Sequence, residues 1–143
     1  MQPIGFQDAL EKVMQVDPTY DREAYCFLRD ALESTLKRRK KTRKDTNGHV
    51  SAPELLEGFR LYCLQEFGPM TIMVLDQWNI RATEDIGRMV FNLVNAGVFG
   101  ATEEDSVEGF RDVYDFDEVF SRPFRPSSTK LSGLPGMFVK TPQ

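Results

Sequence analysis

Apolar residues recur at helical spacing along most of the chain, and this periodicity limits the fold more than any other feature. Over residues 21–40 the apolar positions follow the i, i+3, i+4, i+7 pattern of a helix that buries one face. These positions are Ala24, Phe27, Leu28, Ala31, Leu32 and Leu36. The same spacing predicts further helices over about residues 6–15, 53–67, 70–78 and 84–96. We therefore expect a mainly α fold, built as a compact helical bundle.

Cap and turn residues mark the ends of these helices. Ser51 and Glu54 have the spacing of a capping box, in which each side chain bonds a backbone amide near the other residue. Thr83 can cap the helix that follows it, and Gly68 with Pro69 provides a stop signal. The predicted core consists of Phe27, Leu28, Leu32, Leu56, Phe59, Leu75, Ile86, Val90 and Leu93.

The segment after the last helix predicts a different kind of structure. Residues 98–99 can begin a short strand, and residues 110–116 can form its partner. Residues 101–120 hold eight carboxylates against the single cation Arg111, which is typical of a solvated hairpin tip. Together with the two preceding helices, this short β-hairpin predicts a winged-helix-like C-terminal half.

Length and composition indicate one helical domain over residues 1–120, followed by a flexible tail over residues 121–143. An apolar fraction of 41% with eleven Phe is enough to bury a core. The tail contains four of the eight prolines, several Ser and Gly, four cations and no acid. Such a composition cannot bury enough surface to offset the entropy of ordering it.

Nothing in the sequence indicates export or insertion into a membrane. The N-terminus lacks a basic region followed by an apolar region, and no apolar run approaches the roughly 20 residues of a membrane-spanning helix. Cys26 and Cys63 each fall in the apolar stretch of a predicted helix, where a reduced thiol behaves as a small hydrophobe. We therefore expect a cytoplasmic protein without disulfides.

The winged-helix interpretation names candidate contact residues on the helix over 84–96. In such a protein the exposed residues of this helix reach bases or phosphates in the major groove, and here they are Arg88, Asn92 and Asn95. Glu84 and Asp85 oppose this role, because they would face phosphate. The alternative is a winged-helix-like shape that serves packing or protein contact.

A cationic run is the second candidate site. Because the chain has a net charge of −4, it could bind a polyanion only through a local cluster of cations. Its members are Lys37, Arg38, Arg39, Lys40, Lys41, Arg43 and Lys44. A solvated helix end or a mobile loop would explain some of this charge. The density of positive charge is nevertheless high enough to release counterions from RNA or DNA, or to attract an acidic protein surface. No aromatic residue lies in the run, so nucleic-acid binding should be sequence-independent.

The sequence offers little for catalysis. The only histidine, His49, lies in a turn beside a helix start, where a capping or packing role is the plainer interpretation. Glu54 and Glu57 could act with it in a small hydrolase-like enzyme, although their spacing fits capping and surface roles better. Metal-ligand spacing and the nucleotide-binding and nucleophile motifs do not occur. We expect no cofactor and no metal, and an enzyme remains the alternative.

Short blocks spread over most of residues 6–120 carry a resemblance to a protein family. The blocks are Tyr20 with Glu23-Ala24-Tyr25 and Phe27, Ala31-Leu32, His49-Val50-Ser51 with Glu54-Leu55-Leu56-Glu57-Gly58, Glu66-Phe67-Gly68-Pro69-Met70, Val74-Leu75 with Trp78, Glu84-Asp85-Ile86-Gly87, Val90-Phe91-Asn92-Leu93-Val94, Thr102-Glu103, Asp105-Ser106 and Tyr114-Asp115-Phe116. Through them the chain resembles a family of uncharacterised proteins known mainly from planctomycetes and verrucomicrobia. That family has no assigned function, so the resemblance implies no activity, substrate or cofactor. The cationic run and the tail lie outside the resembling blocks.

The function expected from the residues is therefore that of a non-enzymatic interaction module. Its partner would be a protein or, through the cationic run, nucleic acid bound without sequence preference. We expect no contact with a membrane.

Overall fold

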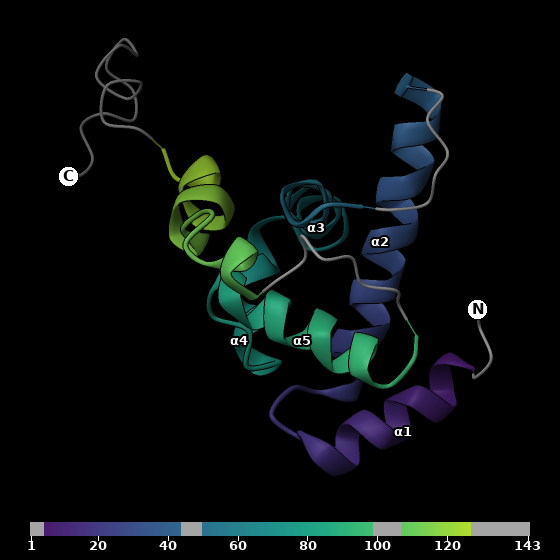
Figure 1. The fold of residues 1–143 in the computed structure, drawn as a ribbon. Helices are drawn as coiled ribbons and strands as arrows, with labels where there is room; N and C mark the ends of the chain where they lie inside the picture. Colours follow the sequence, from purple (N-terminus) through teal and green to yellow (C-terminus); the bar gives the residue numbers. More distant parts are fainter. Residues whose placement is uncertain (1–4, 44–49, 99–106, 127–143) are drawn as a thin grey trace, which may run out of the picture.

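A computed structural model describes residues 5–43, 50–98 and 107–126, with the backbone alone for residues 40–43 and 107. Figure 1 shows the helices packed around one another. The helices are α1 (Phe6–Val16), α2 (Arg22–Arg43), α3 (Ala52–Phe67), α4 (Thr71–Gln77) and α5 (Thr83–Asn95), and the shorter 3₁₀ or π-helical turns are η1 (Gly68–Met70), η2 (Val107–Phe110), η3 (Asp117–Ser121) and η4 (Arg122–Phe124). The prediction of a mainly α fold is confirmed.

The predicted β-hairpin is wrong, and with it the winged-helix-like C-terminal half. Within the described part of the chain no residue forms a strand. Residues 110–116, expected as a strand, instead leave η2 through a turn in which Asp112 has a φ of 51°, a left-handed conformation foreign to strands. Phe99, expected in the partner strand, lies outside the described residues.

The start of α5 supplies the physical reason for this difference. The Thr83 hydroxyl donates to the carbonyl of Phe110 and accepts from the amide of Val113 at 3.2 Å. Backbone groups that would have paired in a ladder are therefore used by a side chain of α5. Thr83 consequently does not cap the helix as expected; Ala82 occupies the cap position, and its amide donates to the Asp85 carboxylate.

The core lies between α2 and α3 and continues toward α4 and α5. An aromatic cluster is centred on Phe27, whose ring lies 5.0 Å from Phe67 and 5.6 Å from Phe59 between centroids. Trp78 closes the cluster from the end of α4, 5.5 Å from Phe27. Edge-to-face and offset ring pairs of this kind add to the free energy gained by burial. Of the predicted core, Leu32 and Val90 are only partly buried, and the other members are buried.

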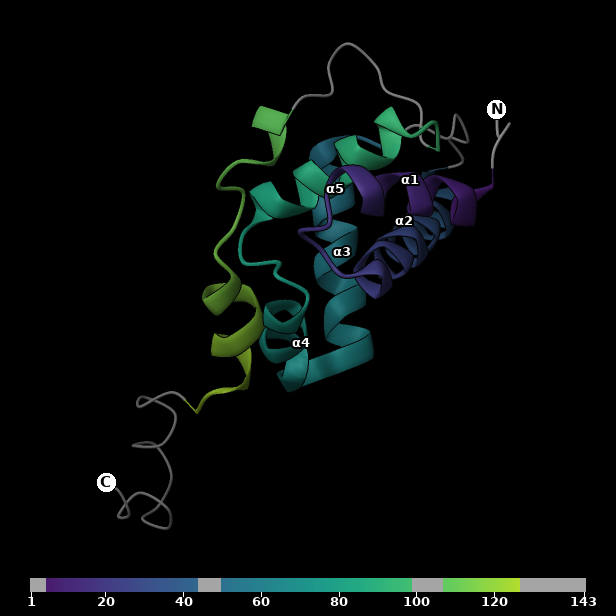
Figure 2. The same cartoon turned by 90° about the horizontal axis from the view of Figure 1, so that it is seen from below.

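The C-terminal segment over residues 107–126 follows the outer side of α5 and α4, as Figure 2 shows. Phe110, Phe116 and Phe120 bury their rings there. The hydroxyl of Tyr114 donates to the carbonyl of Leu56 on α3 at 2.6 Å. This segment is therefore part of the packed structure through Phe120.

The two cysteines, Cys26 and Cys63, are free thiols. Among the residues described here, no helix has both the length and the apolar character needed to span a membrane.

Candidate functional site

The cationic run is helical as far as the structure describes it. Helix α2 continues unbroken through Arg43, and Lys44 is the one member outside the described residues. Lys37 is exposed and Arg38 is partly exposed. Within residues 37–43 the run is therefore a helix end and not a loop. Successive residues are about 1.5 Å apart along the helix axis.

Arg39 differs from its neighbours because its side chain is only 6% exposed. Its Nη1 donates to both carboxylate oxygens of Glu54, at 3.2 and 3.4 Å. Glu54 also accepts from the amide of Ser51, and the Ser51 hydroxyl accepts from the amide of Glu54, so the predicted capping box is confirmed. Arg39 thus connects the basic end of α2 to the first turn of α3.

One turn before Arg39 along α2, the backbones of α2 and α3 pack closely against each other. A methyl group on Gly58 of α3 would overlap the hydroxyl of Thr35 on α2. That hydroxyl donates to the Ala31 carbonyl at 2.8 Å, which holds the Thr35 side chain in place. Beside this contact the two helices form a groove of about 420 Å³, lined by Thr35, Arg38, Arg39, Pro53, Glu54, Glu57, Gly58 and Leu61. The groove carries charges of both signs, so it has no strong preference for an anion.

The end of α2 extends beyond α3, on the opposite side of the molecule from the C-terminal segment (Figure 1). That segment carries exposed carboxylates, among them Asp112 and Asp115. Others are paired with arginines, as Asp117 is with Arg125 at 2.9 Å. The positive and negative surfaces are therefore separated, and the basic end of α2 does not lie beside the acidic segment.

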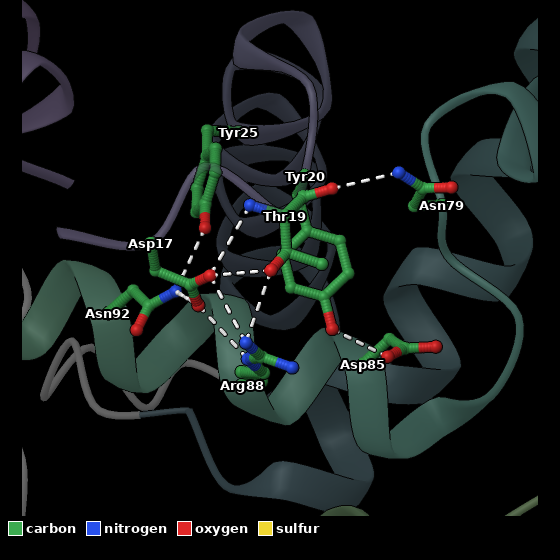
Figure 3. A network of polar contacts seen from close by, with 8 residues as sticks. All are labelled: Asp17, Thr19, Tyr20, Tyr25, Asn79, Asp85, Arg88 and Asn92. Carbon is green, nitrogen blue, oxygen red and sulfur yellow. Dashed lines mark hydrogen bonds and ion pairs between the residues drawn. The ribbon is translucent and has the colours of Figure 1, made fainter. Parts of the chain in front are cut away.

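Of the residues predicted on α5, Arg88 contacts the loop between α1 and α2. Its Nε and Nη2 donate to the two carboxylate oxygens of Asp17 at 3.0 and 3.1 Å, and Nη2 also donates to the Thr19 hydroxyl (Figure 3). The guanidinium lies over the ring of Tyr20, 5.5 Å from its centroid. The hydrogen bonds that Arg88 donates to Asp17 raise the pKa of Arg88. These contacts occupy the side chain within the molecule.

Asn92 joins the same network, and Asn95 does not. The Asn92 amide donates to Asp17 at 2.9 Å and to the Tyr25 hydroxyl at 3.0 Å (Figure 3). Asn95 is exposed, on the edge of a groove of about 270 Å³ between the ends of α1 and α5. The structure therefore does not bring the three predicted residues together on one free helix face.

Asp17 is the centre of this network, and the sequence interpretation did not identify it as a functional residue. Burial alone would raise its pKa, but hydrogen bonds from Thr19, Asn92 and Arg88 outweigh burial and hold the pKa well below its usual range. The available signal was local: an aspartate two residues before a threonine, across Pro18, is a turn pattern in which the carboxylate accepts from the chain ahead. That pattern does not reveal the partners on α5.

The neighbouring Tyr20 makes a second connection to α5. Its hydroxyl donates to Asp85 at 2.5 Å. Burial, followed by the hydrogen bond to Asp85, raises the pKa of Tyr20 above its ordinary value. Asn79 completes the arrangement by donating to the Thr19 carbonyl at 2.9 Å. These hydrogen bonds together hold the loop between α1 and α2 against α5.

Of the residues of the enzymatic alternative, the structure describes Glu54 and Glu57, and both are bonded within the protein. His49 lies outside the described residues, and Glu54 bonds Ser51 and Arg39. Glu57 is paired with Arg60, whose hydrogen bonds lower the pKa of Glu57. Over residues 5–43, 50–98 and 107–126 no group of three His, Cys, Asp or Glu side chains could hold a metal ion.

Comparison of the chain with protein-family models, with curated proteins and with solved structures gives no match. The resemblance drawn from short sequence blocks therefore stays a prediction. The case for a function depends on the chemistry of the surfaces described above.

Proposed function

We propose that this protein is a non-enzymatic interaction module that binds nucleic acid through the basic end of α2, without sequence preference. The observation that carries the proposal is the continuation of α2 as a helix through Arg43, past the Arg39–Glu54 pair that joins it to α3. A helix places these cations at regular intervals, whereas a loop would have to be ordered on binding at an entropic cost.

The expected energetics are those of phosphate neutralisation. Lysine and arginine side chains that contact phosphates release condensed counterions, and this release is the main source of non-specific affinity. The run contains cations and Thr42 only, and cations are attracted to the phosphates of every sequence alike. Binding should accordingly depend on salt and not on sequence.

Arg39 has a structural role in this proposal. Its guanidinium is buried against Glu54, so it supports the helix that carries the other cations. A variant meant to test binding should therefore leave Arg39 intact, because breaking a buried ion pair is destabilising.

The test measures fluorescence anisotropy of labelled DNA and RNA of unrelated sequences over a range of salt concentrations. The wild-type protein should bind them with similar affinity, which should fall steeply with salt. The triple variant Lys37→Gln, Lys40→Gln, Lys41→Gln should bind more weakly and lower the salt slope by about one unit per lost contact. The matched control Arg81→Gln, Arg111→Gln, Arg122→Gln removes equal charge from exposed sites elsewhere and should leave binding almost unchanged. Absence of binding by the wild-type protein at low salt would overturn the proposal and leave an acidic protein as the partner to seek.

A further inference from the structure

We infer that an apolar patch on the outward side of α4 is a docking site for residues 130–140 of this same chain. The inference does not depend on the proposed function, because the patch contains no residue of the cationic run. It rests on the side chains that α4 exposes, on the charges around them and on the place where the described chain ends. Residues 130–140 themselves lie outside the described residues.

The patch consists of Met70, Met73 and Val74, with the rings of Phe67 and Trp78 at its edge. Thr71 and Leu75 are the buried residues of α4, and positions three or four apart share one face of a helix. Met73 therefore lies on the opposite face, and it is 59% exposed, while Met70 is 50% exposed. Val74 is partly exposed, and so are Phe67 and Trp78, whose ring centroids lie 5.9 Å apart.

The two methionines make this patch different from scattered exposed apolar residues. Only five large apolar side chains of the described chain are exposed, and two of them lie within one turn here. Isolated exposed residues are ordinary, whereas neighbouring ones mark a contact surface. The methionine side chain is flexible and polarisable, so it adapts to irregular apolar partners.

The charges around the patch favour a cationic occupant. Residues 66–79 include Glu66 and Asp76 and no cation. Asp76 pairs with Arg81 at 3.1 Å, and the carboxylates of η3 pair with nearby arginines. Glu66 is exposed and has no ion pair with any residue that the structure describes. The unpaired charge at the border of the patch is therefore negative.

Residues 130–140 have the chemistry that such a surface would bind. This stretch holds five apolar residues between two lysines and contains no acid: Lys130, Leu131, Leu134, Met137, Phe138, Val139 and Lys140. Its apolar side chains would remove those of the patch from water, which is favourable. Its lysines would complement the negative border, and this charge complementarity helps to select the partner.

The described chain ends close enough to the patch for this contact. Turn η3 packs against α4 and η1, and Figure 2 shows the C-terminal segment running beside α4. From Pro126, five extended residues span about 17 Å, so residue 131 can reach the patch. A short linker gives an effective concentration in the millimolar range. Even a weak contact would therefore form within one molecule before a second copy could compete.

The experiment follows the NMR signals of isotope-labelled methionine methyl groups in the whole chain. The variant Leu134→Ser, Phe138→Ser should shift the signals of Met70 and Met73 toward those of free methionine, because their apolar cover is lost. Met89, which is buried in α5, should not move. The matched control Val16→Ser, Val113→Ser removes exposed apolar side chains elsewhere and should leave Met70 and Met73 unchanged.

A reciprocal variant tests the contact from the other side. Met70→Ser, Met73→Ser should shift the signal of Met137 toward that of free methionine. Lys130→Gln, Lys140→Gln should shift Met70 and Met73 in the same direction as loss of the apolar residues, but less.

Three results would overturn the inference. The first is no movement of Met70 and Met73 when Leu134 and Phe138 are changed. The second is a wild-type spectrum in which Met70 and Met73 move on dilution, because a second copy would then cover the patch. The third is an equal movement of Met89, which would indicate a loosened core and not an uncovered patch. None of these results bears on nucleic-acid binding, so the proposed function is tested separately.

Discussion

At the scale of single residues, the Asp17 carboxylate does more for the structure than its place in a loop suggests. It accepts hydrogen bonds from Arg88 and Asn92 on α5 and from Thr19 in its own loop. Its side chain is 15% exposed, so solvent screens these charged contacts only in part. The consequence is that one acid attaches the α1–α2 loop to α5.

We predict that Asp17→Asn lowers the free energy of unfolding at pH 7 by about 1–3 kcal/mol, because charged hydrogen bonds are replaced by weaker neutral ones. The folded-state pKa of Asp17 is lowered, so its contribution is present above the ordinary aspartate pKa of about 3.9. The contribution declines as pH falls below that value, toward the lowered pKa. Urea unfolding of both proteins at several pH values should show the difference shrinking in acid. The exposed Asp8→Asn is the control, and a difference that persists unchanged at pH 2 would contradict the prediction.

Residue roles were predictable from the sequence where they depend on neighbours along the chain. The Ser51–Glu54 capping box needs only a spacing of three residues, and it is present. The roles of Arg39, Arg88 and Asn92 depend on residues 15 to 75 positions away. Helical periodicity alone cannot reveal such partners, and Arg39 looks like any other cation of its run.

At the scale of the elements, the contact between α2 and α3 depends on a residue without a side chain. The hydroxyl of Thr35 fills the space that a methyl group on Gly58 would need. Thr35 cannot turn away easily, because a β-branched side chain in a helix has few allowed rotamers. The two helices can therefore approach closely only with glycine at position 58.

We predict that Gly58→Ala lowers the free energy of unfolding by about 1–3 kcal/mol through overpacking, although alanine in a helix favours folding by about 1 kcal/mol over glycine. Thermal or urea unfolding measures the loss. Gly109→Ala is the control, since its added methyl would lie 3.5 Å from the Ala52 Cβ, an ordinary contact. Adding Thr35→Ala to Gly58→Ala should restore part of the loss, and a double variant as unstable as the sum of both single changes would refute this account.

Element types were predictable for the helices and not for the segment after α5. The helices have long, repeated patterns of apolar residues, and periodicity is most informative there. Residues 110–116 form a short stretch rich in Phe, Val and Tyr, residue types that favour strands. Their backbone groups are instead bonded by Thr83 of α5, an interaction that no local pattern encodes.

At the scale of the whole molecule, the C-terminal segment and the helices share one core. Phe120 is 1% exposed and belongs to the same buried cluster as Leu75 and Leu56. Its ring packs 5.3 Å from that of Phe116 between centroids. Since the segment and the helices bury one another's apolar surface, they should unfold together.

We predict that Phe120→Ala costs about 3–5 kcal/mol, the usual range for an aromatic ring removed from a core. The single tryptophan, Trp78, lies in the aromatic cluster around Phe27 and reports on the packing of α2, α3 and α4. Its fluorescence and far-ultraviolet circular dichroism should give coincident denaturation curves, both shifted by the substitution. The exposed Phe124→Ala is the control. A fluorescence midpoint that does not move would show that the C-terminal segment unfolds on its own.

The separation of the basic end of α2 from the acidic C-terminal segment also has a kinetic consequence. The molecule carries a net charge of −4, so a distant polyanion repels it, while at short range the basic end is attracted. Added salt weakens both effects, since the screening length is about 10 Å at 0.1 M ionic strength. The weaker repulsion speeds the encounter and the weaker attraction slows it, so the two effects of salt on the rate of encounter oppose each other. Only the attraction holds the bound complex together. Salt should consequently shorten the lifetime of the complex much more than it slows its formation.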